Sequence, residues 1–238
     1  MNINNISIGL PCYNEEKNIE TVIKKCLSFI KRNKIKNWEL LLVDNKSTDQ
    51  TVNIIQNLIN KSKSSKIKLL RNKKNILYSG SANKIIQKSK YNIVSIMDSD
   101  DQYDPNDIAK LFISMHKNNY DLIIGKRVFR KDSIFRKIIS KIFLILSKVL
   151  IDNNLADLNC GLRILKKNNK IKNYINYYIN FCNPELFAKY KNKNLKINEL
   201  KIKHFNRDHG KSIHNLSNLI KTFFVVTIYL WNLKNFKD

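Results

Sequence analysis

Short apolar runs alternate with amphipathic segments along the first part of the chain. The apolar runs predict strands that are covered on both faces, and they lie at Asn5–Leu10, Trp38–Val43, Lys66–Leu70 and Ile93–Met97. Between them, hydrophobic residues recur at spacings of three and four, which predicts helices at Ile19–Ile30, Val52–Ile59 and Ser79–Lys90. This order predicts an α/β fold whose sheet is mostly parallel and joined by right-handed crossovers.

Polar side chains follow three of these strands at the point where each strand ends. The polar segments are Pro11–Glu15, Asp44–Asp49 and Asp98–Gln102. Because ligands of parallel sheets bind at the carboxyl ends of the strands, we expect the three segments to meet at one edge. A simpler interpretation is that Asn14, Asp49 and Asp104 only cap the helices that follow. The chain has neither a G-x-G-x-x-G loop nor a Walker-type phosphate loop, so a nucleotide would be held by these segments instead.

The third polar segment concentrates negative charge. Asp98 and Asp100 stand two residues apart, and Gln102 follows them. Carboxylates this close repel one another, whereas Mg²⁺ or Mn²⁺ takes oxygen ligands and is completed by substrate phosphates. These residues are therefore a candidate half-site for a metal bound to a diphosphate. The alternative is a solvated aspartate-rich turn before a helix that begins near Pro105.

The composition fits one globular domain with an excess of positive charge. The 238 residues suffice for one substantial core, and 44 Lys and Arg against 19 Asp and Glu leave a formal charge of +25. This charge favours an anionic partner such as nucleic acid, anionic lipid or a phosphorylated substrate. Lys, Asn and Ile are abundant throughout, however, so drift toward AT-rich codons explains part of the charge without any function.

The cysteine spacing and the first residues of the chain indicate the cellular compartment of the protein. The four cysteines are scattered, without the spacing of a zinc site or of a disulfide framework. Met1–Asn5 is polar and is followed by a short strand, which is not the pattern of a secretory signal. We therefore expect the reducing cytosol.

Two later segments are candidates for contact with a membrane. Ile134–Ile151 predicts an amphipathic helix with lysines on one side, a pattern typical of helices in a membrane interface. Phe223–Trp231 is a nearly continuous apolar run, shorter than the ~20 residues that span a bilayer. Both segments are equally typical of helices that cover a core. We divide the chain into a main domain, residues 1–212 with the interface helix at 133–152, and a C-terminal apolar helix at 213–238.

The polar segments belong to a larger set of ordered motifs. The motifs are P-C-Y-N-E-E at Pro11–Glu16, V-D-N-K-S-T-D-Q-T at Val43–Thr51, M-D-S-D-D-Q-Y-D-P at Met97–Pro105, I-G-K-R at Ile124–Arg127, D-L-N-C-G-L-R at Asp157–Arg163, and the segment Ile202–Ser212. In this order they resemble the family 2 glycosyltransferases of GT-A fold. Within that family they are most similar to the dolichol- and polyprenol-phosphate sugar synthases, whose D-A-D-L-Q-H-P-P element carries the metal.

The resemblance implies a role for each matching residue. The nucleotide would be held by Pro11, Tyr13, Glu15, Val43 and Asn45. Asp98 and Ser99 would border the phosphates of the nucleotide sugar, and Asp100 with Gln102 would bind Mg²⁺ or Mn²⁺. Arg127 and Arg207 would contact phosphates, so the catalytic set is Asp98, Asp100, Arg127 and Arg207. Two positions depart from the family pattern. Asn45 stands where many members have Asp. Ile213 stands where the dolichol enzymes have Lys, so either Lys211 makes the contact of that Lys or the contact is absent.

The implied function is a metal-dependent, inverting transfer of a hexose from a nucleotide sugar to polyprenyl phosphate, at the cytoplasmic face of a membrane. A lipid monophosphate is largely ionised at neutral pH and needs no protein base, only cations to hold it. We expect those cations to be Arg130, Arg136 and Arg163. If the acceptor is instead a glycan hydroxyl, a carboxylate must remove its proton, and Asp157 or Glu185 is the candidate.

A basic nucleic-acid-binding protein is the non-enzymatic alternative. The chain has no recognisable nucleic-acid-binding module and its strand ends are acidic, so no nucleic-acid partner is expected.

Overall fold

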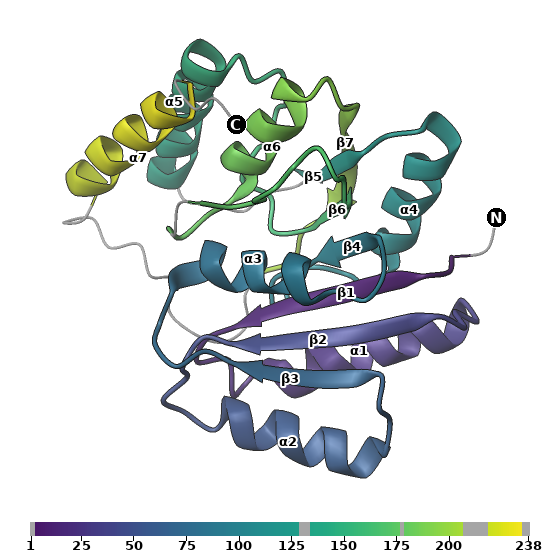
Figure 1. The fold of residues 1–238 in the computed structure, drawn as a ribbon. Coiled ribbons are helices and arrows are strands. Elements are labelled where there is room, and N and C mark those ends of the chain that lie inside the picture. The colour runs from purple at the N-terminus through teal and green to yellow at the C-terminus, as the bar shows by residue number, and fades with distance from the viewer. Residues whose placement is uncertain (1–2, 129–133, 177–178, 207–218, 235–238) are drawn as a thin grey trace.

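The structure, a computed structural model, describes residues 3–128, 134–176, 179–206 and 219–234. A twisted sheet crosses this part of the molecule and carries helices on both faces (Figure 1). Its strands are β1 (Ile6–Cys12), β2 (Trp38–Asp44), β3 (Ile67–Arg71), β4 (Ile93–Ile96), β5 (Leu122–Val128), β6 (Arg163–Lys166) and β7 (Ile197–Lys203). The helices are α1 (Ile19–Arg32), α2 (Thr51–Ser62), α3 (Leu77–Lys88), α4 (Asn106–Asn118), α5 (Ile134–Ile151), α6 (Asn183–Asn192) and α7 (Leu219–Lys234).

The sheet confirms the predicted α/β fold and adds a reversal of direction. The strand order is β3-β2-β1-β4-β6-β5-β7, and β1 to β4 run parallel, as predicted. β6 runs antiparallel to both of its neighbours, and Ile96 at the end of β4 lies opposite Arg163 at the start of β6. The chain that enters β6 therefore lies beside the chain that leaves β4.

Burial on both faces explains why the strands read as apolar runs. Every residue of β1 is buried, and β2 is buried from Glu39 to Asp44. α3 packs against β1 so closely that position 9 requires glycine, because a Cβ on Gly9 would lie 2.2 Å from Cγ2 of Ile85. The sheet and its helices thus form a rigid base for the loops at the strand ends.

Helices α5, α6 and α7 form a group at the end of the molecule away from β1 to β3 (Figure 1). α7 packs along α5 and also contacts α6. The ring of Phe181 joins the group, since it meets Phe143 of α5 and Tyr229 of α7 edge-on, with centroids 5.7 Å and 5.4 Å away. In the described ranges, no helix has both the length and the apolar character needed to cross a membrane.

Candidate functional site

The three polar segments meet at the carboxyl edge of β1, β2 and β4. The first and second are joined because Asn14 N donates a hydrogen bond to Ser47 Oγ (3.0 Å). The third is joined to the first because Ser99 Oγ donates to the carbonyl oxygen of Pro11 (2.7 Å). The predicted convergence on one edge is therefore confirmed.

Helix capping accounts for some of the same side chains. Asp49 Oδ1 accepts a hydrogen bond from Thr51 N (3.0 Å), and Asp104 Oδ1 accepts one from Asn106 N (2.9 Å), at the first residues of α2 and α4. Asn14 caps no helix, because α1 begins after Asn18. The N-cap positions of α2 and α4 are nevertheless Gln50 and Pro105, and Asp49 also accepts a hydrogen bond from Glu16 N (3.1 Å) in the first polar segment. The capping interpretation is therefore wrong for Asn14 and does not account fully for Asp49.

The residues predicted to hold a nucleotide differ in how far a ligand can reach them. Tyr13 is the most open, with 39% of its surface exposed, and Glu15 is half-buried. Pro11 and Val43 are buried within β1 and β2. Val43 is 0% exposed, so neither its side chain nor its backbone is open to a ligand, contrary to the predicted nucleotide contact.

Asn45 holds the segment between β3 and α3. Its Oδ1 accepts hydrogen bonds from Asn72 Nδ2 (3.1 Å) and Ile76 N (2.9 Å). Its Nδ2 donates to Asn75 Oδ1 (2.8 Å). An aspartate could accept the first two bonds but could not donate the third. The departure from the family pattern thus has a structural reason in this chain.

Asp44 is a candidate that the sequence reasoning missed. Its Oδ1 accepts a hydrogen bond from Ser47 N (3.1 Å), whereas its buried Oδ2 has no hydrogen-bond partner among the described residues. The closest cation is distant for a hydrogen bond, since Arg71 Nε lies 4.0 Å from Oδ2. Buried carboxylate oxygens without a partner are rare, so this oxygen is a candidate acceptor for a ligand or a water. The available signal was its position at the end of β2, next to Asn45.

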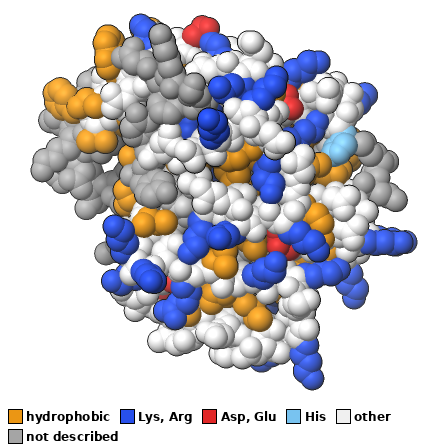
Figure 2. Space-filling model, in the orientation of Figure 1, with side chains coloured by type: hydrophobic (Ala, Val, Ile, Leu, Met, Phe, Trp, Pro, Cys, Tyr) orange, Lys and Arg blue, Asp and Glu red, His pale blue; other side chains and the backbone are white. Residues whose placement is uncertain are grey.

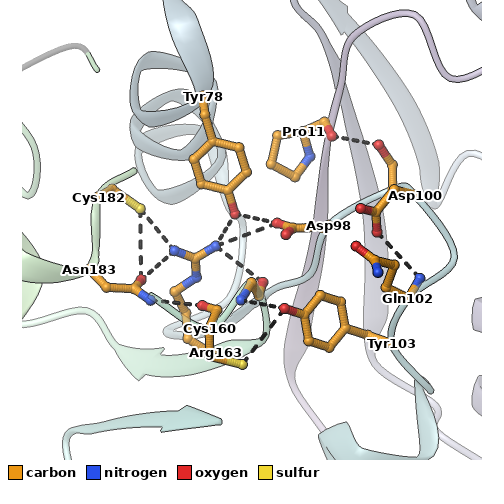
Figure 3. Close-up of polar contacts among 12 residues, drawn as sticks. Pro11, Tyr78, Asp98, Asp100, Gln102, Tyr103, Cys160, Arg163, Cys182 and Asn183 are labelled. Atoms are coloured by element: carbon orange, nitrogen blue, oxygen red, sulfur yellow. Dashed lines mark hydrogen bonds and ion pairs between the residues drawn. The ribbon is translucent and has the colours of Figure 1, made fainter. Parts of the chain in front are cut away.

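Asp100 and Gln102 lie in the segment that leaves β4 (Figure 3). Gln102 N donates to Asp100 Oδ1 (3.3 Å), and Gln102 Nε2 donates to the carbonyl oxygen of Phe205 (3.1 Å). The adjacent Asp101 turns away to an ion pair with Lys25 of α1 (2.7 Å). Asp101 therefore pairs with α1, whereas Asp100 and Gln102 contact each other and Gln102 contacts Phe205.

The donor set fits a hard divalent cation that is completed by a ligand. In the part of the chain that the structure describes, no group of three or more His, Cys, Asp or Glu residues is arranged to hold a metal. Asp98, Asp100 and Gln102 are only partly buried and offer oxygen atoms. Oxygen ligands are what Mg²⁺ and Mn²⁺ prefer, and such ions bind through one or two carboxylates with phosphates and water in the remaining positions.

Asp98 is held by groups from two other segments (Figure 3). The hydroxyl of Tyr78, at the start of α3, donates to Asp98 Oδ1 (2.6 Å). Burial raises the pKa of Tyr78 well above its ordinary value, so the hydroxyl stays protonated and remains a donor. Arg163 Nη2 lies 3.9 Å from the same oxygen.

The position of Arg163 corrects the expectation that it holds an acceptor phosphate. Its side chain is 1% exposed, because β6 begins in the middle of the sheet. The guanidinium donates to Cys182 Sγ (2.9 Å) and to the carbonyl oxygen of Gly161 (3.2 Å), and it also contacts Asn183 and Tyr78. An acceptor at the surface would not reach it.

Arg127, predicted to contact phosphates, lies at the end of β5 and is paired with Asp157. Its Nε and Nη2 each donate to one carboxylate oxygen at 2.7 Å, and its backbone N donates as well (3.0 Å). Burial opposes the charge of the guanidinium, but the bonds to Asp157 outweigh it and raise the pKa of Arg127. The carboxylate of Asp157 is thus already neutralised by a cation.

Glu185, the other candidate base, is fully buried in α6. Its Oε1 lies 3.1 Å from Lys189 Nζ and accepts a hydrogen bond from Asn176 N (2.6 Å). Both candidate bases therefore have structural partners. The remaining predicted cations, Arg130, Arg207 and Lys211, lie outside the described residues, as does the side chain of Arg136.

The fold and the acidic edge match a known class of enzymes. The sequence model of Glycosyl transferase family 2 matches residues 7–181. The chain belongs to glycosyl transferase family 2, as the motifs indicated.

Relatives in this family transfer sugars to polyprenyl phosphates. The undecaprenyl-phosphate 4-deoxy-4-formamido-L-arabinose transferase of Pectobacterium carotovorum is 28% identical over 165 residues, which cover 69% of this chain and 50% of the relative. The dodecaprenyl-phosphate galacturonate synthase of Rhizobium johnstonii is 27% identical over 230 residues, 93% of this chain and 64% of the relative. The chain thus spans from half to about two thirds of the length of these relatives.

Solved structures show the same fold. Glucosyl-3-phosphoglycerate synthase from Mycobacterium tuberculosis, in complex with Mn²⁺, UDP-glucose and phosphoglyceric acid, superposes with a TM-score of 0.71. The match covers 98% of this chain and 81% of that structure, at 14% sequence identity. This likeness confirms the GT-A fold.

Proposed function

We propose that this chain is a metal-dependent, inverting glycosyltransferase that moves a hexose from a nucleotide sugar to a polyprenyl phosphate. The observation that carries the choice of acceptor is the two-point ion pair between Arg127 and Asp157, together with the burial of Glu185. Neither carboxylate is placed to remove a proton from a hydroxyl. A phosphate acceptor needs no base, since it is already ionised at neutral pH. The relatives that use polyprenyl phosphates support the same choice.

The nucleotide end of the donor would lie along β1 and β2. Tyr13 is open enough to contact a base or ribose, and Asp44 Oδ2 would accept a hydrogen bond from a base N–H. Such a bond would satisfy the oxygen that has no partner among the described residues. Asn45 would act indirectly, by holding the segment that leads to α3.

The diphosphate would lie at Asp98, Ser99, Asp100 and Gln102. Asp100 and Gln102 would hold Mg²⁺ or Mn²⁺, which stabilises negative charge on the leaving diphosphate. In one displacement, an acceptor phosphate oxygen forms a bond to the anomeric carbon while the bond from that carbon to the nucleoside diphosphate breaks. The bonding electrons leave with the nucleoside diphosphate, and the configuration inverts. Arg207 would supply positive charge near the phosphates, whereas the charge of Arg127 is balanced by Asp157.

The outer face of α5 and α7 would contact the membrane that contains the acceptor. Exposed hydrophobic side chains gather at this end of the molecule (Figure 2), and they are Ile142, Ile145 and Val149 of α5 with Phe224, Val225, Ile228 and Trp231 of α7. Lys141, Lys148 and Lys234 are exposed on the same two helices. Apolar side chains flanked by lysines are typical of helices that lie in a membrane interface, and each lysine adds ~1 kcal/mol of attraction to an anionic surface. We place this contact at the cytoplasmic leaflet.

A choice of acceptors tests this proposal. Labelled UDP- and GDP-hexoses are incubated with Mn²⁺ and one of three acceptors: a polyprenyl phosphate, the same polyprenol without phosphate, or a glycan. We expect transfer to the polyprenyl phosphate alone, with an inverted anomeric configuration in the product. Transfer to the glycan would instead support a hydroxyl acceptor. If no sugar is transferred to any of the three acceptors, the proposed glycosyltransferase activity is contradicted.

A further inference from the structure

The carboxylate of Asp98 is enclosed by side chains and backbone from distant parts of the chain. Tyr78 donates to its Oδ1 (2.6 Å), and Arg163 Nη2 lies 3.9 Å from that oxygen. On the other side, Gly161 leaves no room: a Cβ at this position would lie 1.9 Å from Asp98 Oδ2. Tyr78, Gly161 and Arg163 together form what we term the Asp98 cradle. Figure 3 shows Tyr78 and Arg163 beside Asp98.

Arg163 needs a negative partner, because a buried cation is costly without one. Its hydrogen bonds go to neutral groups, namely an amide, a backbone carbonyl, a phenol and a thiol. The thiol is neutral because burial raises the pKa of Cys182 to about 11. Among the residues that the structure describes, the carboxylate within ion-pair distance of the guanidinium is that of Asp98. The charge of Arg163 is therefore directed at the first carboxylate of the Asp-x-Asp pair.

The cradle is itself fixed by its surroundings. Gly161 N donates to the hydroxyl of Tyr103 (2.8 Å), and Asn183 Nδ2 donates to the carbonyl oxygen of Cys160 (2.7 Å). The first bond holds the turn that enters β6 against the turn that leaves β4, and the second holds it against the start of α6. These contacts restrict the positions that are open to the carboxylate of Asp98.

We propose that Arg163 is a positioning residue for the donor site: with Tyr78 and Gly161 it holds the carboxylate of Asp98 toward the cation and diphosphate, and it does not contact the acceptor. This inference rests on the proposed function, since it requires donor binding at Asp98 and Asp100. It assigns roles to Tyr78, in α3, and to Gly161, which lie outside the predicted donor and acceptor sets. It also explains why a cation is buried in the middle of the sheet.

Two substitutions test the cradle without removing the buried charge. Tyr78→Phe deletes the hydroxyl that donates to Asp98, and Gly161→Ala places a methyl group where the carboxylate lies. Binding of UDP and of GDP is measured by calorimetry with and without Mn²⁺. We expect each variant to weaken Mn²⁺-dependent binding by about 10-fold or more, because a hydrogen bond to a charged group is lost or displaced. Binding without Mn²⁺ should change by less than about 2-fold.

Tyr190→Phe is the matched control. Its hydroxyl donates to the carbonyl oxygen of Lys166 (2.5 Å), at the opposite end of β6 from Arg163. We expect it to lower the melting temperature while its Mn²⁺-dependent nucleotide binding stays at the wild-type level. Equal loss of binding in Tyr190→Phe, or wild-type binding in Tyr78→Phe, would overturn the inference. If the wild-type protein binds neither nucleotide with Mn²⁺, the proposed function fails and this inference fails with it.

A double-mutant cycle tests Arg163 itself. If Arg163 acts through Asp98, then Arg163→Met weakens Mn²⁺-dependent binding by about 10-fold in the wild-type background and by less than about 2-fold when Asp98 is already Asn. Equal effects in both backgrounds would show that Arg163 acts independently of Asp98. Should Arg163→Met fail to fold, the Tyr78 and Gly161 variants decide the question.

Discussion

Arg127 and Asp157 form an ion pair with two parallel hydrogen bonds, both of 2.7 Å, between the end of β5 and the turn before β6. The side chains are 14% and 9% exposed, so water screens the pair only weakly. The pair joins two segments at the acidic edge of the sheet. Because its carboxylate is paired with Arg127, Asp157 is not available as a base that removes a proton from an acceptor.

Removing one member of this pair should therefore be costly. We expect Asp157→Asn to lower the free energy of unfolding by about 3 kcal/mol, because Arg127 is left buried without its counter-charge. Urea denaturation measures the change. The double variant Arg127→Met/Asp157→Leu should recover part of the loss, since neither charge is then buried alone. An Asp157→Asn protein as stable as the wild type would show that the pair is not held in solution.

Asp100 and Asp101 are neighbours with different expected roles. Asp100→Ala should reduce Mn²⁺-dependent transfer by about 100-fold or more, because the carboxylate that would hold the metal is gone. Asp101→Asn should remove only the ion pair with Lys25, an exposed contact worth ~1 kcal/mol or less, because Asn also tolerates the left-handed backbone at this position (φ 64°). Sugar transfer and the rise in melting temperature on adding UDP with Mn²⁺ are the two measurements. Equal losses in both variants would contradict a specific metal role for Asp100.

Asp44→Asn tests the nucleotide end of the site. The substitution replaces an accepting oxygen with a donor at the place where a base N–H is proposed to bind. We expect affinity for the nucleoside diphosphate to fall about 10-fold, and affinity for pyrophosphate to stay unchanged, because pyrophosphate has no base. Calorimetry with both ligands separates a contact with the base from a general loss of structure. Equal losses for both ligands would count against a contact with the base.

Local sequence patterns predicted the parallel half of the fold and where its polar loops meet. The run at residues 93–97 was predicted as a strand because burial on both faces leaves it almost entirely apolar, with Ser95 as its one polar side chain. Arg163 was misjudged because charge alone suggests a surface position, whereas its burial depends on the antiparallel pairing of β6 with β4. That pairing joins residues far apart in the sequence, and the four-residue strand β6 has no distinct pattern of its own.

The buried Glu39 predicts a dependence of stability on pH. Burial alone would raise its pKa, but hydrogen bonds from Lys90 N, Ser7 and Lys68 outweigh burial, and the pKa is lowered. A carboxylate with a lowered pKa contributes stability above its unfolded pKa of about 4.5, and that contribution is lost as the pH falls through the folded value.

The test is the variant Glu39→Gln. At pH 7 we expect it to lower the free energy of unfolding by about 1–3 kcal/mol, because hydrogen bonds to a buried charged group are weakened. The difference from the wild type should shrink as the pH is lowered below about 4.5. Denaturant melts at several pH values measure it, and a difference independent of pH would contradict an ionised Glu39 in the folded state.

The apolar face of α5 and α7 makes the proposed membrane contact measurable. Val149 and Phe224 are 70% and 61% exposed, so replacing either with Asp removes little packing from the core. Each substitution replaces apolar surface with a negative charge, which an anionic bilayer repels. We expect Val149→Asp and Phe224→Asp to reduce cosedimentation with vesicles that contain anionic lipid by about 5-fold or more, with unchanged melting temperatures. Ile113→Asp is the control, because Ile113 is also exposed but lies on α4, away from this face. If the control loses as much binding as Val149→Asp, the attraction is a general effect of charge; if none of the variants changes cosedimentation, this face is not the contact.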